Sequence, residues 1–114
     1  MTEASQPDSV VVVLATAPNS DVAAELADRL VSERLAACVS QVPGVLSRYR
    51  WQGTEEEATE VLLIIKTQSS RSRVLVRRLA ELHPYEVPEI LVLPVADGFP
   101  PYLDWVRKET DEGR

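Results

Sequence analysis

The sequence predicts a ferredoxin-like α+β sandwich of order βαββαβ, with an antiparallel sheet, a long hairpin between the second and third strands, and a short C-terminal helix. The first observation behind this prediction is the order of strand-like and helix-like patterns, which divides into two βαβ halves. The second is that the handedness of crossover connections leaves few other topologies. The third is the length of 114 residues, which suits one domain. We expect that domain to occupy residues 10–108.

The first strand is predicted at residues 10–16, because a continuous β-branched run is typical of a strand buried on both faces. The polar residues 1–9 before it are expected to form a disordered tail. After the strand, apolar side chains recur at helical spacing as far as about Leu35. Asn19 or Ser20 is the expected cap of this first helix.

The second and third strands are expected to form the long hairpin. The second strand begins near Ala36, and a bulge or bend is predicted at residues 43–44, where proline and glycine interrupt it. Residues 53–54 provide the turn, and residues 59–67 form the third strand. We expect the tip of the hairpin to carry Trp51. Four glutamates are expected to be solvated at this tip: Glu55, Glu56, Glu57 and Glu60.

A rigid corner is predicted between the second helix and the fourth strand. Ser69 or Ser70 is expected to cap this helix, and Pro84 ends it, because proline disfavours helical geometry in the residue before it. Pro88 then holds the chain extended into the fourth strand at residues 90–95.

The last part of the chain is expected to contain a short helix over residues 102–108. Prolines precede it, and proline suits the first position of a helix. Residues 109–114 are expected to be frayed.

The composition limits the classes of partner. A net charge of −6 and a pI near 4.8 argue against nucleic acid and against anionic membrane surfaces. An acidic balance is compatible with metal cations, although it is also common in proteins that are acidic only for solubility. A single cysteine allows no intramolecular disulfide and suits a reducing compartment. No signal-peptide pattern or membrane-span run is present, so we expect a cytoplasmic location.

Three of the predicted strands are apolar on both faces, namely residues 10–14, 61–65 and 90–95. An antiparallel sheet with helices on one side and water on the other should alternate apolar and polar residues. The short C-terminal helix cannot cover the second face, and a large exposed apolar patch marks a partner site. We therefore expect that face to be buried between copies in a closed homo-oligomer. The alternative is that these runs reflect β-propensity alone.

The only histidine and the only cysteine are the candidate metal ligands. His83 follows a helix, where an imidazole either interacts with the helix dipole or binds a metal ion. Cys38 begins an apolar strand and is either a core residue or a soft-metal ligand or redox thiol. Their spacing matches no metal motif, so only the fold can bring them together.

Four further residues are candidates for a ligand cleft at a subunit interface: Trp51, Lys66, Tyr85 and Glu89. Binding pockets combine apolar walls with a few fixed polar groups, which this set would supply. The alternative is a salt bridge between Lys66 and Glu89, with the two aromatic residues as packing anchors. The sequence contains no Gly-rich phosphate loop, HExxH or CxxC, and we expect a protein that is not an enzyme.

Six segments resemble, in order and spacing, the CutA divalent-cation-tolerance proteins. They are Leu35-Ala36-Ala37-Cys38-Val39, Pro43-Gly44-Val45, Tyr49-Arg50-Trp51-Gln52-Gly53, Ile65-Lys66-Thr67, His83-Pro84-Tyr85-Glu86-Val87-Pro88-Glu89-Ile90 and Tyr102-Leu103-Asp104-Trp105. The resemblance implies a ferredoxin-like homotrimer akin to the PII signalling proteins, in which hairpins and sheet faces meet between subunits. It also implies a cytoplasmic role in tolerance of copper and other divalent metals, and it brings no established reaction. The alternative function is a PII-like module that binds a small anionic metabolite at the inter-subunit cleft.

The resemblance also bears on copper. In family members described as copper-binding, the candidate ligands are a cysteine before Thr-Ala-Pro and two adjacent histidines before Pro-Tyr. Those positions here hold Ala15, Leu82 and His83, so only His83 keeps a ligand side chain. The implied ligand is Cu(II) or another divalent cation, held weakly, and no other cofactor is expected.

Overall fold

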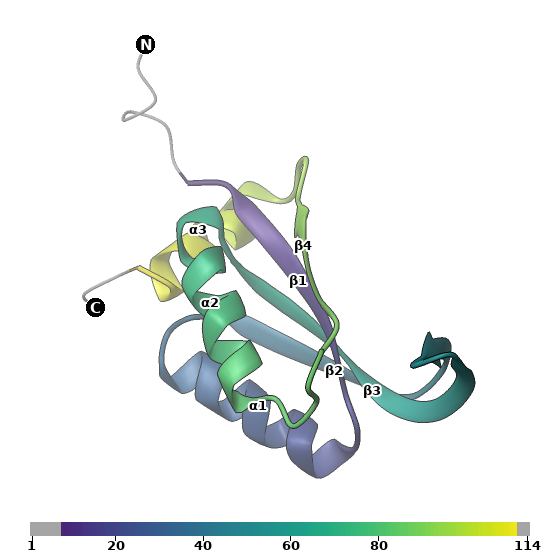
Figure 1. The fold of residues 1–114 in the computed structure, drawn as a ribbon. Coiled ribbons are helices and arrows are strands. Elements are labelled where there is room, and N and C mark those ends of the chain that lie inside the picture. Colours follow the sequence, from purple (N-terminus) through teal and green to yellow (C-terminus); the bar gives the residue numbers. More distant parts are fainter. Residues whose placement is uncertain (1–7, 112–114) are drawn as a thin grey trace.

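The computed structural model describes residues 8–111, so most of the predicted tail and the last three residues lie outside the described chain. The elements are, in order, β1 (Val10–Ala17), α1 (Ser20–Ser32), β2 (Cys38–Trp51), β3 (Thr54–Gln68), α2 (Ser69–Leu82), β4 (Ile90–Pro94) and α3 (Pro100–Glu109). The strands form one antiparallel sheet in the order β2-β3-β1-β4. Figure 1 shows α1 and α2 together on one side of this sheet. The predicted ferredoxin-like sandwich is confirmed.

The hydrophobic core lies between the sheet and the pair of helices. Val13 of β1 pairs with Ile65 of β3, Ala15 pairs with Leu63, and all four side chains are fully buried. The helices contribute Ala23, Leu26, Leu30, Leu75 and Leu79. Because side chains alternate along a strand, the intervening residues of β1 and β3 face away from the helices.

Helix α1 begins as predicted and ends earlier than predicted. The side chain of Asn19 accepts a hydrogen bond from the backbone N–H of Val22 at 2.9 Å, so the expected cap is confirmed. The helix stops at Ser32 rather than near Leu35. Arg34 adopts a left-handed backbone with φ 61°, and the N–H of Leu35 turns back to the Leu30 carbonyl. This helix-ending geometry is usual for glycine, so the arginine at position 34 did not predict that the helix ends here.

The long hairpin and its bulge are confirmed. The register between β2 and β3 shifts between Val42 and Val45, and Gly44 takes a positive φ of 74° there. Strand β3 begins at Thr54, several residues before the predicted start. Near the tip, Arg48 of β2 forms an exposed ion pair of 2.6 Å with Glu57, its cross-strand neighbour in β3. Figure 1 shows the hairpin projecting beyond the rest of the domain. The whole described chain, hairpin included, measures 52 Å in its longest dimension.

The cap of α2 differs from the prediction. The Asp8 carboxylate accepts hydrogen bonds from the backbone N–H of Ser70 and from the hydroxyl of Ser69, so a residue from the start of the chain caps this helix in place of a serine. At the other end, His83 has an extended backbone with ψ 138°, as expected for a residue before proline. The corner predicted from Pro84 is therefore present.

Helix α3 extends one residue beyond its predicted end, and the following residue is well anchored. Thr110 is fully buried, although residues 109–114 were expected to be frayed. The side-chain amide of Gln68 donates to the Thr110 hydroxyl at 3.0 Å and to the Arg107 carbonyl at 3.1 Å. These bonds tie the end of α3 to the sheet where α2 begins.

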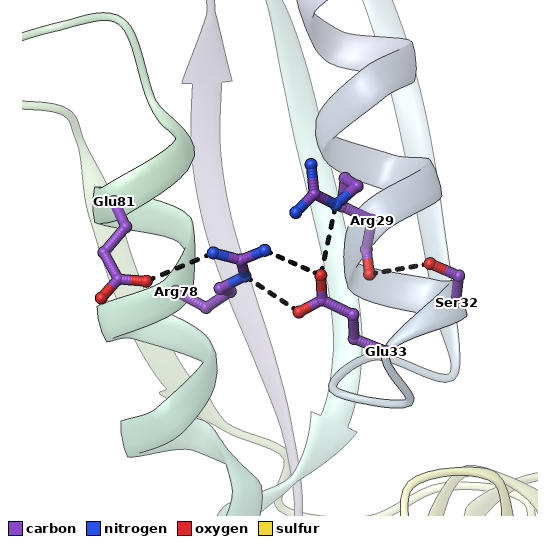
Figure 2. Close-up of polar contacts among 5 residues, drawn as sticks. All are labelled: Arg29, Ser32, Glu33, Arg78 and Glu81. Carbon is purple, nitrogen blue, oxygen red and sulfur yellow. Dashed lines mark hydrogen bonds and ion pairs between the residues drawn. The ribbon is translucent and has the colours of Figure 1, made fainter.

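An ion-pair network joins the two large helices (Figure 2). The Arg78 guanidinium of α2 donates from Nε and Nη2 to the two carboxylate oxygens of Glu33 at the end of α1, each at 2.9 Å. Arg29 adds a bond of 3.2 Å from α1, and Glu81 lies 3.4 Å from Arg78. The hydrogen bonds from Arg78, with those from Arg29, lower the pKa of Glu33 below its usual value.

Replacing Glu33 with glutamine is expected to reduce the loss of stability in acid. Because the folded-state pKa of Glu33 is lowered, its contribution is present above the unfolded carboxyl pKa of 4.5 and is lost as the pH falls through the folded value. Urea midpoints measured at neutral pH and at several acidic pH values give the comparison. Glu25→Gln, also on α1, is the control and should follow the wild-type curve. Coincident curves for wild type and Glu33→Gln would contradict this expectation.

Candidate functional site

His83 is held by hydrogen bonds at both ring nitrogens. Nε2 lies 2.7 Å from the carbonyl oxygen of Thr16 in β1, and Nδ1 lies 3.1 Å from the backbone nitrogen of Tyr85. Because the Tyr85 N–H donates to Nδ1, the ring proton is on Nε2, which donates to Thr16. The side chain is 7% exposed. Its imidazole therefore fastens the corner to β1, and a metal ion at either nitrogen must displace one of these bonds.

Tyr85 extends this set of contacts to the hairpin. Its ring lies 4.8 Å from the imidazole of His83, and its hydroxyl donates to Glu60 at 2.8 Å. Burial, followed by the hydrogen bond to Glu60 and the negative charge of that carboxylate, raises the pKa of Tyr85 to about 12. Thr16, His83, Tyr85 and Glu60 thus form one continuous chain of contacts from β1 to β3.

Glu60 was expected in a solvated tip, and this expectation was wrong. The residue is 7% exposed and pairs across the hairpin with Val45, at the base of the projecting part. Glu60 lies within the third strand predicted at residues 59–67, and its position directly before the apolar run is the signal that would have separated it from the solvated tip. Sequence reasoning missed it as a partner of Tyr85 because the two residues are 25 positions apart.

Replacing Tyr85 with phenylalanine is expected to remove a phenol that ionises near pH 12. Because the folded-state pKa lies above the ordinary value of 10, the stabilisation from Tyr85 is complete below pH 10 and is lost as the pH rises to about 12. The phenolate absorbance, followed against pH, measures this step. Tyr102→Phe is the control, and its titration curve should retain the Tyr85 ionisation step near pH 12. Identical titration curves for wild type and Tyr85→Phe would contradict the assignment.

The face of the sheet that points away from α1 and α2 is largely apolar. We call it the outer face and define it by the ladder positions between those of the core. Its apolar members are Val12, Leu14, Val42, Leu62, Ile64, Leu91 and Leu93. Leu91 is 54% exposed, Leu93 41% and Val42 40%, although they are large apolar side chains in a regular sheet. An exposed apolar area of this kind, formed from all four strands, is typical of surfaces that contact another molecule.

Lys66 and Cys38 lie on the outer face as direct cross-strand neighbours. The Lys66 ammonium donates to the Ser40 hydroxyl at 2.7 Å and to the Ile64 carbonyl at 3.1 Å. Cys38 is a partly buried free thiol. Both are therefore positioned by strands rather than by loops.

The structure does not bring the two predicted metal ligands together. Cys38 pairs with Lys66, whereas His83 contacts Thr16, which pairs with Leu62 of the same strand. Four residues along a strand span about 13 Å. Within residues 8–111, no group of three or more His, Cys, Asp or Glu side chains is arranged to hold a metal ion. Two of the three positions that hold candidate copper ligands in copper-binding family members carry no ligand side chain here. Ala15 is fully buried, and Leu82 packs against the core.

The four predicted cleft residues are also distributed over the chain. Trp51 is 40% exposed next to the hairpin turn, six residues along β2 from the level of Glu60, or about 20 Å. Glu89 is exposed directly before β4. Tyr85 contacts Glu60, and Lys66 contacts neutral groups. Convergence of this set at a cleft between subunits stays a prediction.

Among the helices of residues 8–111, none has the length and apolar character needed to cross a membrane.

Comparisons with known proteins agree with this architecture. Residues 11–109 match the family described as CutA1 divalent ion tolerance protein. The divalent-cation tolerance protein CutA of Thermus thermophilus is 52% identical over 99 residues, which cover 87% of this chain and 96% of the relative. Protein CutA of Mus musculus is 49% identical over 105 residues, covering 92% of this chain. The chain spans only 59% of the length of that mouse protein.

A solved structure shows the same fold. The crystal structure of CutA1 from Oryza sativa has a TM-score of 0.90 and 40% identity, and the match covers 94% of this chain and 98% of that one. The resemblance found in the six sequence segments is thus confirmed by the whole-domain match. The chain belongs to the CutA1 divalent ion tolerance protein family.

Proposed function

We propose that this protein acts in tolerance of divalent metal ions, as a homotrimer that binds its ligands rather than transforming them. Relatives at 52% and 44% identity carry the name divalent-cation tolerance protein. The observation that carries the proposal is the outer face, where apolar side chains of all four strands remain accessible in a single chain. The family resemblance supports three copies, with the projecting hairpin reaching to a neighbour.

Binding rather than catalysis is supported by the engagement of the corner residues. The His83 imidazole has one nitrogen donating and one accepting, both to backbone groups. A general acid or base must exchange its proton with a substrate, and these bonds leave neither nitrogen free to do so. Tyr85 is likewise committed to Glu60. We propose the cytoplasm as the location, although names among the relatives include a chloroplastic and a periplasmic protein.

One chain alone does not supply a fitting donor set for Cu(II), because His83 stands without a second nitrogen or sulfur ligand among the described residues. We propose that metal contact at His83, with Cys38 as a second candidate, is weak and draws on donors of neighbouring copies. Binding there costs a hydrogen bond to Thr16 or Tyr85, which lowers the affinity further.

Calorimetric titration with Cu(II) tests the metal contact. Wild type is expected to bind in the micromolar to millimolar range, and His83→Gln is expected to bind more weakly, since an amide is a poorer copper ligand than an imidazole. Cys38→Ser tests the thiol in the same way. Equal affinities for all three proteins, or no heat below millimolar metal, would remove the direct-ligand role.

The second candidate function is binding of a small anionic metabolite at a cleft between subunits. It is favoured by Lys66, whose ammonium has only neutral acceptors within its own chain. A surface hollow of the described residues lies elsewhere, between α1 and the corner near Leu82 and Pro84. We propose that a site at Lys66 is completed by a second copy. Organic acids and nucleotides that raise the melting temperature of wild type but not of Lys66→Met would support this function.

A further inference from the structure

Lys66 places a positive charge within the apolar outer face. Its two acceptors, Ser40 and Ile64, are neutral, and its neighbours across the ladder are Cys38 and Val12. Among residues 8–111, the ion pairs do not include Lys66. The bond to Ser40 directs the ammonium toward β2 and away from β4. One of its three N–H groups therefore remains for water or for a partner.

Glu89 places a negative charge at the edge of the same face. It lies two positions before Leu91, which is the strand spacing for side chains on one side of a sheet. It is exposed, and no hydrogen bond or ion pair of residues 8–111 involves it. A molecule that covers Leu91 and Leu93 must therefore also desolvate Glu89.

These two charges are too far apart to pair within one chain. Lys66 is level with Val12 on β1, whereas Ile90, which follows Glu89, is level with Ala15. Glu89 thus lies about four residues further along the strands, or about 13 Å, and two strand spacings add about 10 Å across them. An ion pair requires nitrogen and oxygen within about 4 Å.

Covering the outer face leaves each charge in need of a counter-charge, because removing an unpaired ion from water is energetically costly. We propose that, in the assembly inferred above, the Lys66 ammonium of one copy pairs with the Glu89 carboxylate of the next. This inference rests on the proposed homotrimer and adds a specific contact to it. A contact between two different patches repeats around a ring, so each interface holds one such pair.

Glu89 is the favoured acid because it is exposed and shares the strand spacing of Leu91. Glu60, on the same face, accepts from the Tyr85 hydroxyl, and Asp97 lies in the loop after β4, where it accepts from the Gly98 N–H. Three other acids with no ion pair in the described chain lie on α1, on the opposite side of the sheet: Asp21, Glu25 and Asp28. Glu56 lies near the hairpin tip, opposite Tyr49. Glu86 lies on the corner but five positions from Leu91, so it does not share the strand spacing of Glu89. The pair determines how neighbouring copies align more than how tightly they bind. A buried ion pair contributes little net free energy of association, whereas a mismatched charge at the interface is costly.

Charge reversal and restoration test the pair. Sedimentation velocity at fixed protein concentrations compares wild type with Lys66→Glu, Glu89→Lys and the double variant, with circular dichroism as a check of folding. Each single variant is expected to weaken association on the order of 10- to 100-fold, and the double variant is expected to return within about threefold of wild type. Glu86→Lys, the matched control on the same corner, should assemble like wild type.

The outcomes separate this pair from the assembly itself. A wild-type protein that is monomeric would overturn the proposed homotrimer and the ion pair with it. A wild-type protein that assembles while the double variant shows only the added defects of the single variants would overturn the ion pair alone. Restoration of Lys66→Glu by Glu86→Lys rather than by Glu89→Lys would also overturn it.

Discussion

Replacing His83 with alanine is expected to lower the free energy of unfolding by about 2–4 kcal/mol. The substitution removes a 7% exposed ring together with its bonds to the Thr16 carbonyl and the Tyr85 N–H. The Thr16 carbonyl then lacks its side-chain donor, and the ring leaves a void beneath Tyr85. Because the Tyr85 ring packs against the imidazole in a tilted arrangement at 4.8 Å, its bond to Glu60 should loosen as well.

Urea unfolding at one fixed protein concentration measures this effect, since the stability of an oligomer depends on concentration. Glu86→Ala is the matched control on the same corner, because its side chain is exposed and a surface substitution changes stability by about 0.5 kcal/mol or less. A loss below about 1 kcal/mol for His83→Ala would mean that the imidazole does not hold the corner.

Replacing Leu91 with aspartate is expected to weaken association of the chains by at least about 100-fold while leaving each chain folded. Leu91 is 54% exposed in the single chain, so the fold itself loses little packing. Burial of a leucine between copies contributes about 1.5–3 kcal/mol, and a buried aspartate adds a desolvation cost. A factor of 100 corresponds to about 2.8 kcal/mol.

Val31→Asp is the matched control for this substitution. Val31 is 42% exposed on α1, on the opposite side of the sheet, and its replacement should not change the assembly. Sedimentation equilibrium gives the association constants of the three proteins. Unchanged association of Leu91→Asp would show that the outer face is not the contact between copies.

Much of the fold follows from local chemistry that the sequence displays. Pro84 and Pro88 predict the corner because proline restricts its predecessor, and Gly44 marks the bulge because it takes a positive φ. The apolar runs of the strands predict a sheet face that α1 and α2 do not cover, and the exposed Leu91 and Leu93 lie on it. Each of these inferences depends on a few adjacent residues.

What the sequence did not display depends on contacts between distant residues. Asp8 caps a helix that begins 61 positions later, and Glu60 is buried because Tyr85 reaches it from the corner. Neither contact has a local signature. The candidate site was predicted as a set of residue types, and Trp51 and Lys66 lie far apart along the hairpin within one chain. Their convergence between subunits stays a prediction.

The mass of the protein in solution, measured by light scattering, tests the central proposal most directly. The proposed homotrimer predicts a species of three times the chain mass of 12.7 kDa. It also predicts that Leu91→Asp shifts this species toward the single chain at the same concentration. A wild-type mass of 12.7 kDa at micromolar concentration would contradict the proposed homotrimer.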